Sequence, residues 1–425
     1  MSDLLARRRA AVSASVATAQ TIFLDRARNA EIWDTEGRRY IDFGAGIAVH
    51  NTGHSHPKIL AAAAAQAERY THICFHVMGY EPYVALAERL NALAPIAGPA
   101  KTLFVTTGAE AIENAIKIAR AATSRPAIIG FTGGFHGRTF MAMAVTGKIA
   151  PYKRAVGPFP ADIYRLPFPS AHTGVTVADT LAALDSLFHV DVEPARVAAI
   201  AIETVQGDGG INVAPPELLR ELRARCDQHG ILLIADEVQC GIARTGRMFA
   251  IEHSGVQPDL IAIAKAIGGG FPLAGVIGRA EIMDAPPLGL LGGTYAGPPV
   301  ALAAGLAVLD VIEAENLLER AQTLGERTLA RLRQFESRND LLPIGNIRGL
   351  GSMIGFDLLT ARGSHQVRPE AASLTKRGLD HGILLLACGA VGETIRLLYP
   401  LTIEDEIHEE GLTRLEATLK IDQGT

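Results

Sequence analysis

Short apolar runs alternate with amphipathic segments along the middle of the chain. Six runs of strand length fall at 102–107, 126–131, 197–203, 231–238, 260–265 and 273–278. Segments with helical periodicity include 57–70, 81–94 and 216–230, the last with Gly230 placed to end its helix. Such an alternation predicts an α/β fold with a mostly parallel central sheet covered by helices on both faces.

The two ends of the chain follow a different pattern. Residues 28–43 are typical of two short strands joined in a hairpin at residues 35–37. A long helical stretch begins at 298, and the chain after it indicates strands and a further helix. We therefore expect a smaller α+β domain built from both termini. The predicted division is 1–56 (an N-terminal segment joining the small domain), 57–315 (the large domain) and 316–425 (the C-terminal small domain).

The composition is that of an ordinary globular enzyme. A chain of 425 residues is too long for a single hydrophobic core, and its 48% hydrophobic and 20% charged residues are unexceptional. The net charge of −5 gives no reason to expect nucleic acid or an anionic membrane surface as a partner. The longest apolar runs are strand-sized or broken by glycine, so no segment is expected to span a bilayer.

The cysteines and the N-terminus favour a reducing compartment. Cys74, Cys226, Cys240 and Cys388 include no C-x-x-C pair, which argues against a zinc site or a disulfide framework, and no metal is expected. The Arg-rich N-terminus is faintly similar to a transit peptide, but Asp3 precedes the arginines and no long apolar region follows. We expect a cytoplasmic protein.

The segment 102–122 reads as a strand, a turn at Gly108 and a helix. The first N–H groups of a helix lack partners within it and lie at the positive end of its dipole, so an anion such as phosphate is a natural ligand there. A plain strand-to-helix connection, with Thr106 or Thr107 near the N-cap, is the alternative. The segment is neither a Walker motif nor G-x-G-x-x-G, which disfavours a nucleotide.

Two charged residues stand at the ends of apolar strands. Asp236 closes the run LLIAD, and Lys265 closes IAIAK before three glycines. Alone, each has an ordinary explanation as a strand-end acid or a lysine that reaches solvent. With the phosphate-binding turn they match the needs of pyridoxal 5′-phosphate: a lysine for the Schiff base, an acid for the pyridine nitrogen and a helix N-terminus for the phosphate. The carboxyl edge of a parallel sheet would bring them together.

Eight motifs spread over nearly the whole chain carry a resemblance to one family. They are IDFGAGIAVHNTGHSHP (41–57), TTGAEAIENAIKIAR (106–120), GGFHGRTF (133–140), IETVQGDGG (202–210), LLIADEVQCGIARTG (232–246), AKAIGGGFPLAG (264–275), GGTYAGPP (292–299) and IRLLYPLTI (395–403). With them the sequence resembles the class III, fold-type I pyridoxal-phosphate aminotransferases, and most of all the 4-aminobutyrate aminotransferases. The resemblance implies a homodimer with a shared active site.

The resemblance also implies which residues bind the cofactor. Lys265 would form the Schiff base and shuttle the proton, and Asp236 would pair with the pyridine nitrogen. Phe135 would stack on the ring, and Ala109 replaces a serine that is frequent in the family. The implied cofactor-binding set is Gly108, Ala109, Phe135, His136, Asp236, Val238, Gln239, Lys265 and Thr294, the last reaching the phosphate of the partner subunit.

Two arginines would recognise the substrates, because a planar guanidinium pairs bidentately with a carboxylate. Arg138 is expected to hold the distal carboxylate, and Arg396 the α-carboxylate of glutamate or 2-oxoglutarate. Asp208 stands where the family has a glutamate that pairs with the second arginine when the substrate lacks an α-carboxylate. The other implied positions are Ile47 in the pocket wall, Glu203 as a partner near the substrate arginine or a simple strand-end acid, and His76 as a substrate contact or part of the wall.

These roles imply transamination of 4-aminobutyrate with 2-oxoglutarate, giving succinic semialdehyde and L-glutamate. The partners would be small amino acids and 2-oxo acids. Alternatives are another ω-amino donor, such as 5-aminovalerate or β-alanine, and an amino-acid racemase, since some class III racemases carry aspartate at the position of Asp208. A non-catalytic binding module is a further alternative, which the joint presence of Lys265, Asp236 and Arg138 argues against.

Overall fold

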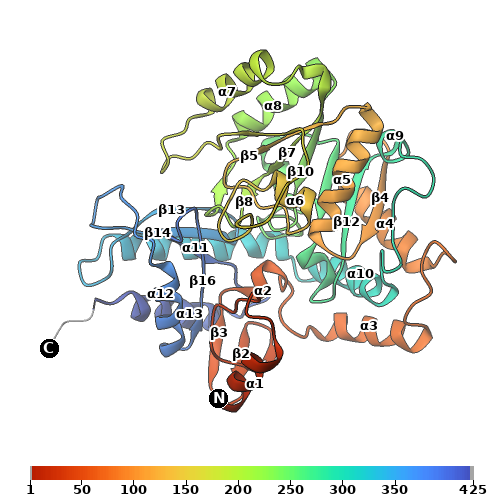
Figure 1. Cartoon of the computed structure of the whole chain (residues 1–425). Coiled ribbons are helices and arrows are strands. Elements are labelled where there is room, and N and C mark those ends of the chain that lie inside the picture. The colour runs from red at the N-terminus through yellow and green to blue at the C-terminus, as the bar shows by residue number, and fades with distance from the viewer. Residues whose placement is uncertain (1, 422–425) are drawn as a thin grey trace.

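The computed structural model describes residues 2–421 and centres on a seven-stranded sheet (Figure 1). In spatial order the strands are β4 (Ala100–Val105), β12 (Ala274–Arg279), β11 (Leu260–Ile263), β10 (Leu232–Asp236), β7 (Val197–Glu203), β5 (Ala127–Phe131) and β6 (Ile163–Leu166). The five strands from β11 to β6 are parallel, and β12 runs antiparallel to both of its neighbours. The mostly parallel sheet that the sequence predicts is therefore confirmed.

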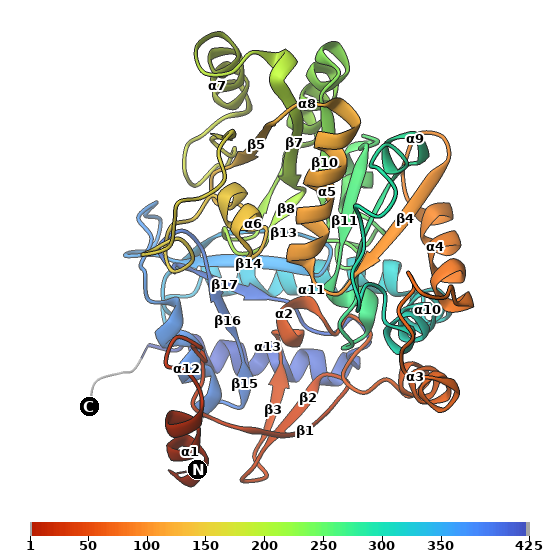
Figure 2. The same cartoon turned by 45° about the vertical axis from the view of Figure 1, so that its right-hand side comes forward.

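Alternate residues of the central strands point to opposite faces of this sheet. In β10, Leu233 and Ala235 belong to the core on one face and Ile234 to the core on the other. In Figure 2, α5 lies across the front of the sheet. The core on this face is built with the helices α5 (Gly108–Thr123), α6 (Phe140–Val145) and α9 (Ala280–Met283). The core on the opposite face is built with α3 (Pro57–Arg69), α4 (Glu81–Leu93), α7 (Val177–Val190), α8 (Pro216–His229) and α10 (Pro299–Ala314).

Both termini build the remaining part of the molecule. An antiparallel sheet has the order β13 (Ile344–Leu350), β14 (Met353–Leu358), β17 (Thr394–Leu397) and β16 (Leu386–Cys388). The N-terminal strands β1 (Leu24–Arg28), β2 (Glu31–Asp34) and β3 (Arg39–Asp42) form a second sheet with β15 (Ile383–Leu384), which pairs in parallel with β3. A shared core joins Ile41 and Phe43 to Leu397 and Tyr399 from the other end of the chain.

The remaining elements are short or terminal. They are α1 (Ser2–Ala11), α2 (Ala45–Ala48), α12 (Ala371–Asp380), α13 (Asp405–Leu419), β8 (Val205–Gln206), β9 (Asn212–Val213) and the 3-10 turns at Pro194–Arg196, Ala250–Ser254 and Lys265–Gly268. No helix within residues 2–421 combines the length and the apolar character needed to cross a membrane.

The long helical stretch expected from residue 298 consists of two helices. α10 ends at Ala314, and α11 (Leu317–Glu336) begins after Asn316, whose φ of 51° is left-handed and interrupts the helix. Leu317 packs in the core of the large sheet and Phe335 in the core of the small one, so α11 leads from one core to the other. The domain limits stay a prediction, and their outermost residues, 1 and 422–425, lie outside the described residues.

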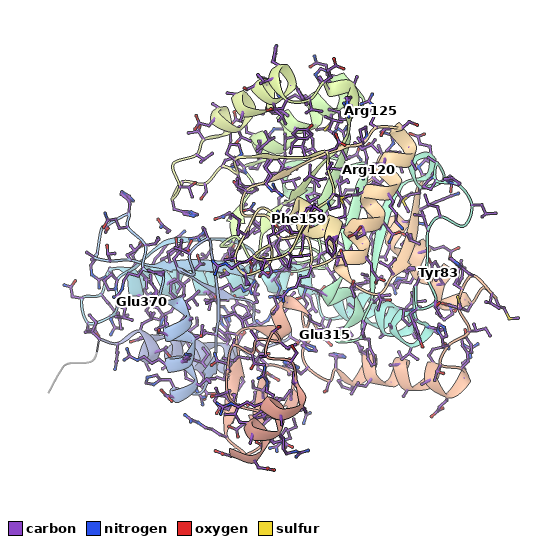
Figure 3. The ribbon with its side chains drawn as sticks, in the orientation of Figure 1. Tyr83, Arg120, Arg125, Phe159, Glu315 and Glu370 are labelled. Carbon is purple, nitrogen blue, oxygen red and sulfur yellow. The ribbon has the colours of Figure 1, made fainter. Side chains whose placement is uncertain are left out.

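The amino edge of the large sheet is closed by side-chain hydrogen bonds. Arg125, labelled near the top of Figure 3, donates to the carbonyl oxygens of Val197, His229 and Gly230. Val197 begins β7, and His229 and Gly230 end α8 just before β10, so one guanidinium joins the amino ends of these two strands. The opposite, carboxyl edge is where the strands open onto a cavity.

Candidate active site

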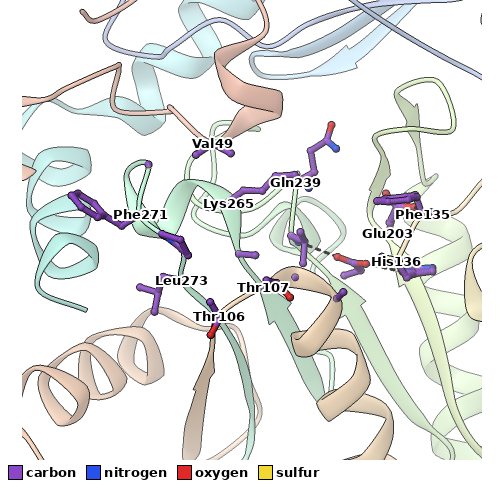
Figure 4. Close-up of a pocket in the computed structure, with 18 residues that line it drawn as sticks. Val49, Thr106, Thr107, Phe135, His136, Glu203, Gln239, Lys265, Phe271 and Leu273 are labelled. Carbon is purple, nitrogen blue, oxygen red and sulfur yellow. Dashed lines mark hydrogen bonds and ion pairs between the residues drawn. The ribbon is translucent and has the colours of Figure 1, made fainter. Parts of the chain in front are cut away.

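The carboxyl ends of neighbouring parallel strands bring charged residues to one edge of the sheet. Asp236, at the end of β10, is in register with Glu203 of β7 and Ala262 of β11. Lys265 follows three residues after Ala262. These residues border a cavity of about 340 Å³, shown in Figure 4. This edge is where ligands bind in open α/β sheets.

The N-terminus of α5 opens into the same cavity. Thr107 caps the helix and forms a reciprocal capping box with Glu110. Among the described residues, the N–H groups of Gly108 and Ala109 have no hydrogen-bond partner, so they are available to an anion. A Cβ on Gly108 would lie 2.8 Å from Val238 Cγ1, which explains why a glycine stands there.

Asp236 is fixed by hydrogen bonds to both of its oxygens. The carboxylate is 3% exposed; Oδ2 lies 2.7 Å from His136 Nδ1, and Oδ1 accepts from the Val238 N–H at 3.0 Å. Burial acts to lower the pKa of His136, but the hydrogen bond and the charge of Asp236 outweigh burial and raise that pKa above its usual value. The imidazole thus orients the carboxylate and balances its charge.

Lys265 lies two residues after the end of β11 and lines the cavity. Its φ of 52° is left-handed, a strained conformation for a residue with a side chain. Burial lowers the pKa of Lys265, outweighing the opposite effect of the Asp236 and Glu203 charges. A lowered pKa increases the share of neutral amine, the form that attacks a carbonyl group.

Phe135 is positioned through its backbone. Its N–H donates to Glu203 Oε2 at 2.7 Å, and the N–H of Gly207 donates to Oε1 of the same carboxylate at 3.1 Å. No ion pair joins Glu203 to Arg138 within residues 2–421. Burial raises the pKa of Glu203. Of the two roles that the sequence left open, the geometry favours a strand-end acid, here one that braces the Phe135 loop.

Gln239 carries an unsatisfied polar atom on the cavity wall. Its side chain is buried, and Oε1 has no hydrogen-bond partner within the described chain. Figure 4 shows Gln239 near Lys265. A buried amide oxygen without a partner costs free energy, which a ligand hydroxyl can recover.

Several predicted residues do not line this cavity. Thr294 is exposed on the loop before α10, and Ile47 is 42% exposed with a left-handed φ of 66°. His76 lies against Gly292, in the loop that carries Thr294, and is exposed. Arg138 is also exposed. The described chain therefore forms the cofactor side of the site more completely than the substrate side.

Tyr152 joins the residues expected to bind substrate. Its ring centroid lies 4.7 Å from that of Phe135 and 5.0 Å from the Arg138 guanidinium carbon. Its hydroxyl donates to Asp208 Oδ2 at 3.2 Å. Burial and Asp208 raise the pKa of Tyr152 to about 12, whereas Arg138 and Arg396 act to lower it. Both arginines therefore lie close enough to act on one phenol.

In the structure Asp208 pairs with Lys148, and its pairing with Arg396, which the resemblance implies for a substrate without an α-carboxylate, stays a prediction. Lys148 Nζ lies 2.9 Å from Asp208 Oδ2, and Tyr152 donates to the same oxygen. Arg396, on β17, is 6% exposed, and neither an ion pair nor a hydrogen bond of its side chain is found within residues 2–421. Lys148 is thus the cation that neutralises Asp208 here.

Lys148 and Tyr152 are the site residues that sequence reasoning missed. Both lie in the loop after α6, where no strand or helix pattern marks a functional position. Their roles arise from contacts with Asp208, about 60 residues away in the chain. No local signal in a single sequence could have found them.

The residues present fit pyridoxal phosphate. Two free N–H groups face the position of a phosphate, Asp236 is a buried carboxylate for a pyridine nitrogen, and Gln239 offers an unsatisfied amide for a ring hydroxyl. Lys265 supplies an amine of lowered pKa. When bound, this cofactor supplies an electron sink for the charge that develops when a bond to the substrate carbon breaks.

The fold and this set of residues define a pyridoxal-phosphate enzyme of fold-type I. The family model described as "Aminotransferase class-III" matches residues 12–419, and the chain therefore belongs to that family. The protein is an aminotransferase, as the motifs indicate.

Relatives and solved structures agree with this assignment. The chain is 51% identical over 417 residues to the 5-aminovalerate aminotransferase of Pseudomonas putida, covering 97% of both chains. It is 49% identical over 413 residues to the 4-aminobutyrate aminotransferase of Escherichia coli, covering 96% of both. The ornithine aminotransferase of Toxoplasma gondii, with partial occupancy of pyridoxal phosphate, matches with a TM-score of 0.85 at 29% identity, covering 98% of this chain and 94% of that one. The expected cofactor is thereby confirmed.

Proposed function

We propose that this aminotransferase transfers the amino group of 4-aminobutyrate to 2-oxoglutarate, giving succinic semialdehyde and L-glutamate. The observation that carries the proposal is the pair of arginines near Tyr152: Arg138 is exposed, and Arg396 is buried without an anionic partner. Glutamate and 2-oxoglutarate bring two carboxylates, and 4-aminobutyrate brings one. A guanidinium for each carboxylate suits the dicarboxylic pair.

The roles of the chain's own residues follow from their positions. Lys265 Nζ would take the proton from the substrate carbon that bears the amine and would donate a proton again later in the transfer. The lowered pKa of Lys265 keeps a share of its amine neutral, and the neutral amine is the form that accepts a proton. Asp236, held by His136, would balance the positive charge of a ring nitrogen. Arg138 would orient the substrate by its distal carboxylate, so that this carbon faces Lys265.

A homodimer with a shared site belongs to the same proposal. Thr294 and Tyr295 are exposed, yet the Tyr295 carbonyl accepts a hydrogen bond from Thr106, at the turn before α5. The loop thus lies beside the phosphate end of the cavity, where Tyr295 stacks on His72 and the exposed Thr294 side chain would reach a second copy. We also propose a cytoplasmic location, which four cysteines without disulfide bonds support.

5-Aminovalerate is the second candidate donor. Two relatives named as 5-aminovalerate aminotransferases are 51% and 50% identical to this chain, beside 49% for the 4-aminobutyrate enzyme. The two donors differ by one methylene, for which discrimination in a pocket is about 10- to 200-fold. β-Alanine is a shorter alternative. No relative described above supports a racemase.

The test adds single donors to the cofactor-loaded protein without an acceptor and follows the visible absorbance of the bound cofactor. 4-Aminobutyrate should abolish the absorbance of the aldehyde form, and 2-oxoglutarate should restore it. If kcat/KM is at least tenfold higher with 5-aminovalerate than with 4-aminobutyrate, then 5-aminovalerate is the donor instead. The proposal would be overturned if no ω-amino acid changed this absorbance while an α-amino acid lost its optical activity.

A further inference from the structure

The substrate side of the site contains a charge arrangement that the proposed function does not explain. Arg396 is a buried guanidinium without a neutralising partner among residues 2–421, while a carboxylate, Asp208, lies in the neighbouring loop. An unpaired buried charge costs free energy, so the lack of an ion pair between Arg396 and Asp208 needs an explanation. The contacts of Lys148 supply one.

Lys148 holds Asp208 through a direct ion pair and links it to the residue that follows β16. Its Nζ lies 2.9 Å from Asp208 Oδ2 and also donates to the Gly389 carbonyl oxygen at 2.9 Å. The Gly389 N–H in turn donates to the Asp208 carbonyl oxygen at 3.0 Å. The Lys148 and Asp208 side chains are only 17% and 14% exposed, so water screens the pair weakly.

Arg396 borders the same loop. In β17, Thr394 and Arg396 point to the same face, because they are two residues apart in one strand. A Cβ on Gly210 would lie 3.3 Å from Thr394 Oγ1, which places this face against the loop that carries Asp208. Asp208 Oδ1 accepts no hydrogen bond within the described chain, so one oxygen of the carboxylate remains available.

We propose that Lys148 is a specificity-determining residue: it holds Asp208 away from Arg396 in the resting site and releases it when a donor without an α-carboxylate binds. This inference rests on the proposed two-arginine function. The resting pocket is thereby set for a dicarboxylic substrate, whose α-carboxylate meets an uncompensated guanidinium. An ω-amino donor leaves that guanidinium unpaired, and the Asp208 carboxylate then exchanges Lys148 for Arg396.

The short side chain of aspartate favours the pairing of Asp208 with Lys148 in the resting site. The carboxylate of Asp208 stands one methylene closer to its own backbone than a glutamate carboxylate would, and that backbone is bonded to Gly389, beside Lys148. Reaching Arg396 therefore requires the carboxylate to leave Lys148 and Tyr152. Tyr152, which bonds the same oxygen, makes leaving harder but carries no competing charge.

The experiment measures binding of glutarate, an unreactive dicarboxylate, to the cofactor-loaded protein by isothermal titration calorimetry. Lys148→Met frees Asp208 to neutralise Arg396, so glutarate should bind about tenfold more weakly, the effect of losing one charge-assisted pair. The KM for 4-aminobutyrate should fall in the same variant. Lys148→Arg, which keeps the charge, should resemble the wild type. Lys117→Met, on the exposed face of α5, is the matched control and should change neither value.

The Asp208→Asn background separates the proposal from a simple charge effect. If Lys148 acts through Asp208, adding Lys148→Met to Asp208→Asn changes glutarate affinity less than twofold. An undiminished tenfold loss in that background would show that Lys148 attracts the ligand by its own charge, and would overturn the proposal. Unchanged glutarate affinity in Lys148→Met would overturn it while leaving the two-arginine function intact. A wild type that fails to bind glutarate would overturn both.

Discussion

Replacing Arg396 by glutamine should separate the two half-reactions. The guanidinium is 6% exposed and has no partner in the described chain, so a substrate carboxylate would meet its poorly screened charge. A hydrogen bond to a charged group contributes about 1.5–3 kcal/mol, or about 10- to 150-fold in kcat/KM. We expect a loss of that size for 2-oxoglutarate and glutamate. For 4-aminobutyrate we expect less than about threefold, because it brings no α-carboxylate.

The assay follows each half-reaction alone, by single-turnover absorbance with the donor or the acceptor added to the matching form of the loaded enzyme. Arg138→Gln is the matched control, since the distal carboxylate is present in both half-reactions and both should suffer equally. Equal losses in Arg396→Gln would refute the assignment of Arg396. The glutamine variant should also unfold at no lower temperature than the wild type, because the change orphans no partner in the described chain.

Three further predictions concern the cofactor side of the site. Asp236→Asn should keep the fold but slow both half-reactions by at least about a hundredfold, since a neutral amide cannot balance a ring cation; rapid-mixing absorbance checks this. Gly108→Ala, which places a Cβ 2.8 Å from Val238 Cγ1, should cost about 1–3 kcal/mol in urea unfolding and weaken cofactor binding, whereas Ala109→Ser should tighten binding. The raised pKa of His136 means that its bond to Asp236 stabilises the fold fully below about pH 6.5 and loses this effect as the pH rises through the folded value. The difference in urea midpoint between the wild type and His136→Gln should therefore shrink with rising pH; a difference that grows would contradict the charge pairing.

The cofactor side of the site could be predicted from the sequence because local pattern and sheet topology determine it. Asp236 and Lys265 end or follow apolar strands, and a parallel sheet places such ends at one edge whatever the details of packing. The N-terminus of α5 follows from the turn at Gly108 and the capping pair of Thr107 and Glu110. These positions needed no knowledge of contacts between distant segments.

The substrate side could not be predicted in the same way. The pairing of Asp208 with Lys148 depends on how a loop after α6 packs against the turn at Gly389, and no periodicity in either segment encodes that packing. The resemblance implied a pairing of Asp208 with Arg396 for substrates without an α-carboxylate, but it gave no sign of the lysine that Asp208 contacts in the structure. The break between α10 and α11 could not be predicted for a related reason, because helical periodicity does not reveal the left-handed φ of Asn316.

A second buried arginine explains how Arg396 keeps its position without side-chain bonds. Arg244 is fully buried and donates to the carbonyl oxygens of Ser352 at 3.2 Å and Tyr399 at 2.8 Å, and to Asn51 Oδ1 at 3.1 Å. Tyr399 lies three residues after Arg396, and Arg244 lies in the loop that follows Asp236. One guanidinium thus ties the backbone near Arg396 to the loop that follows Asp236. β17 is fixed in this way and by its ladder to β14, so the backbone of Arg396 is already in place for the carboxylate that we propose it binds.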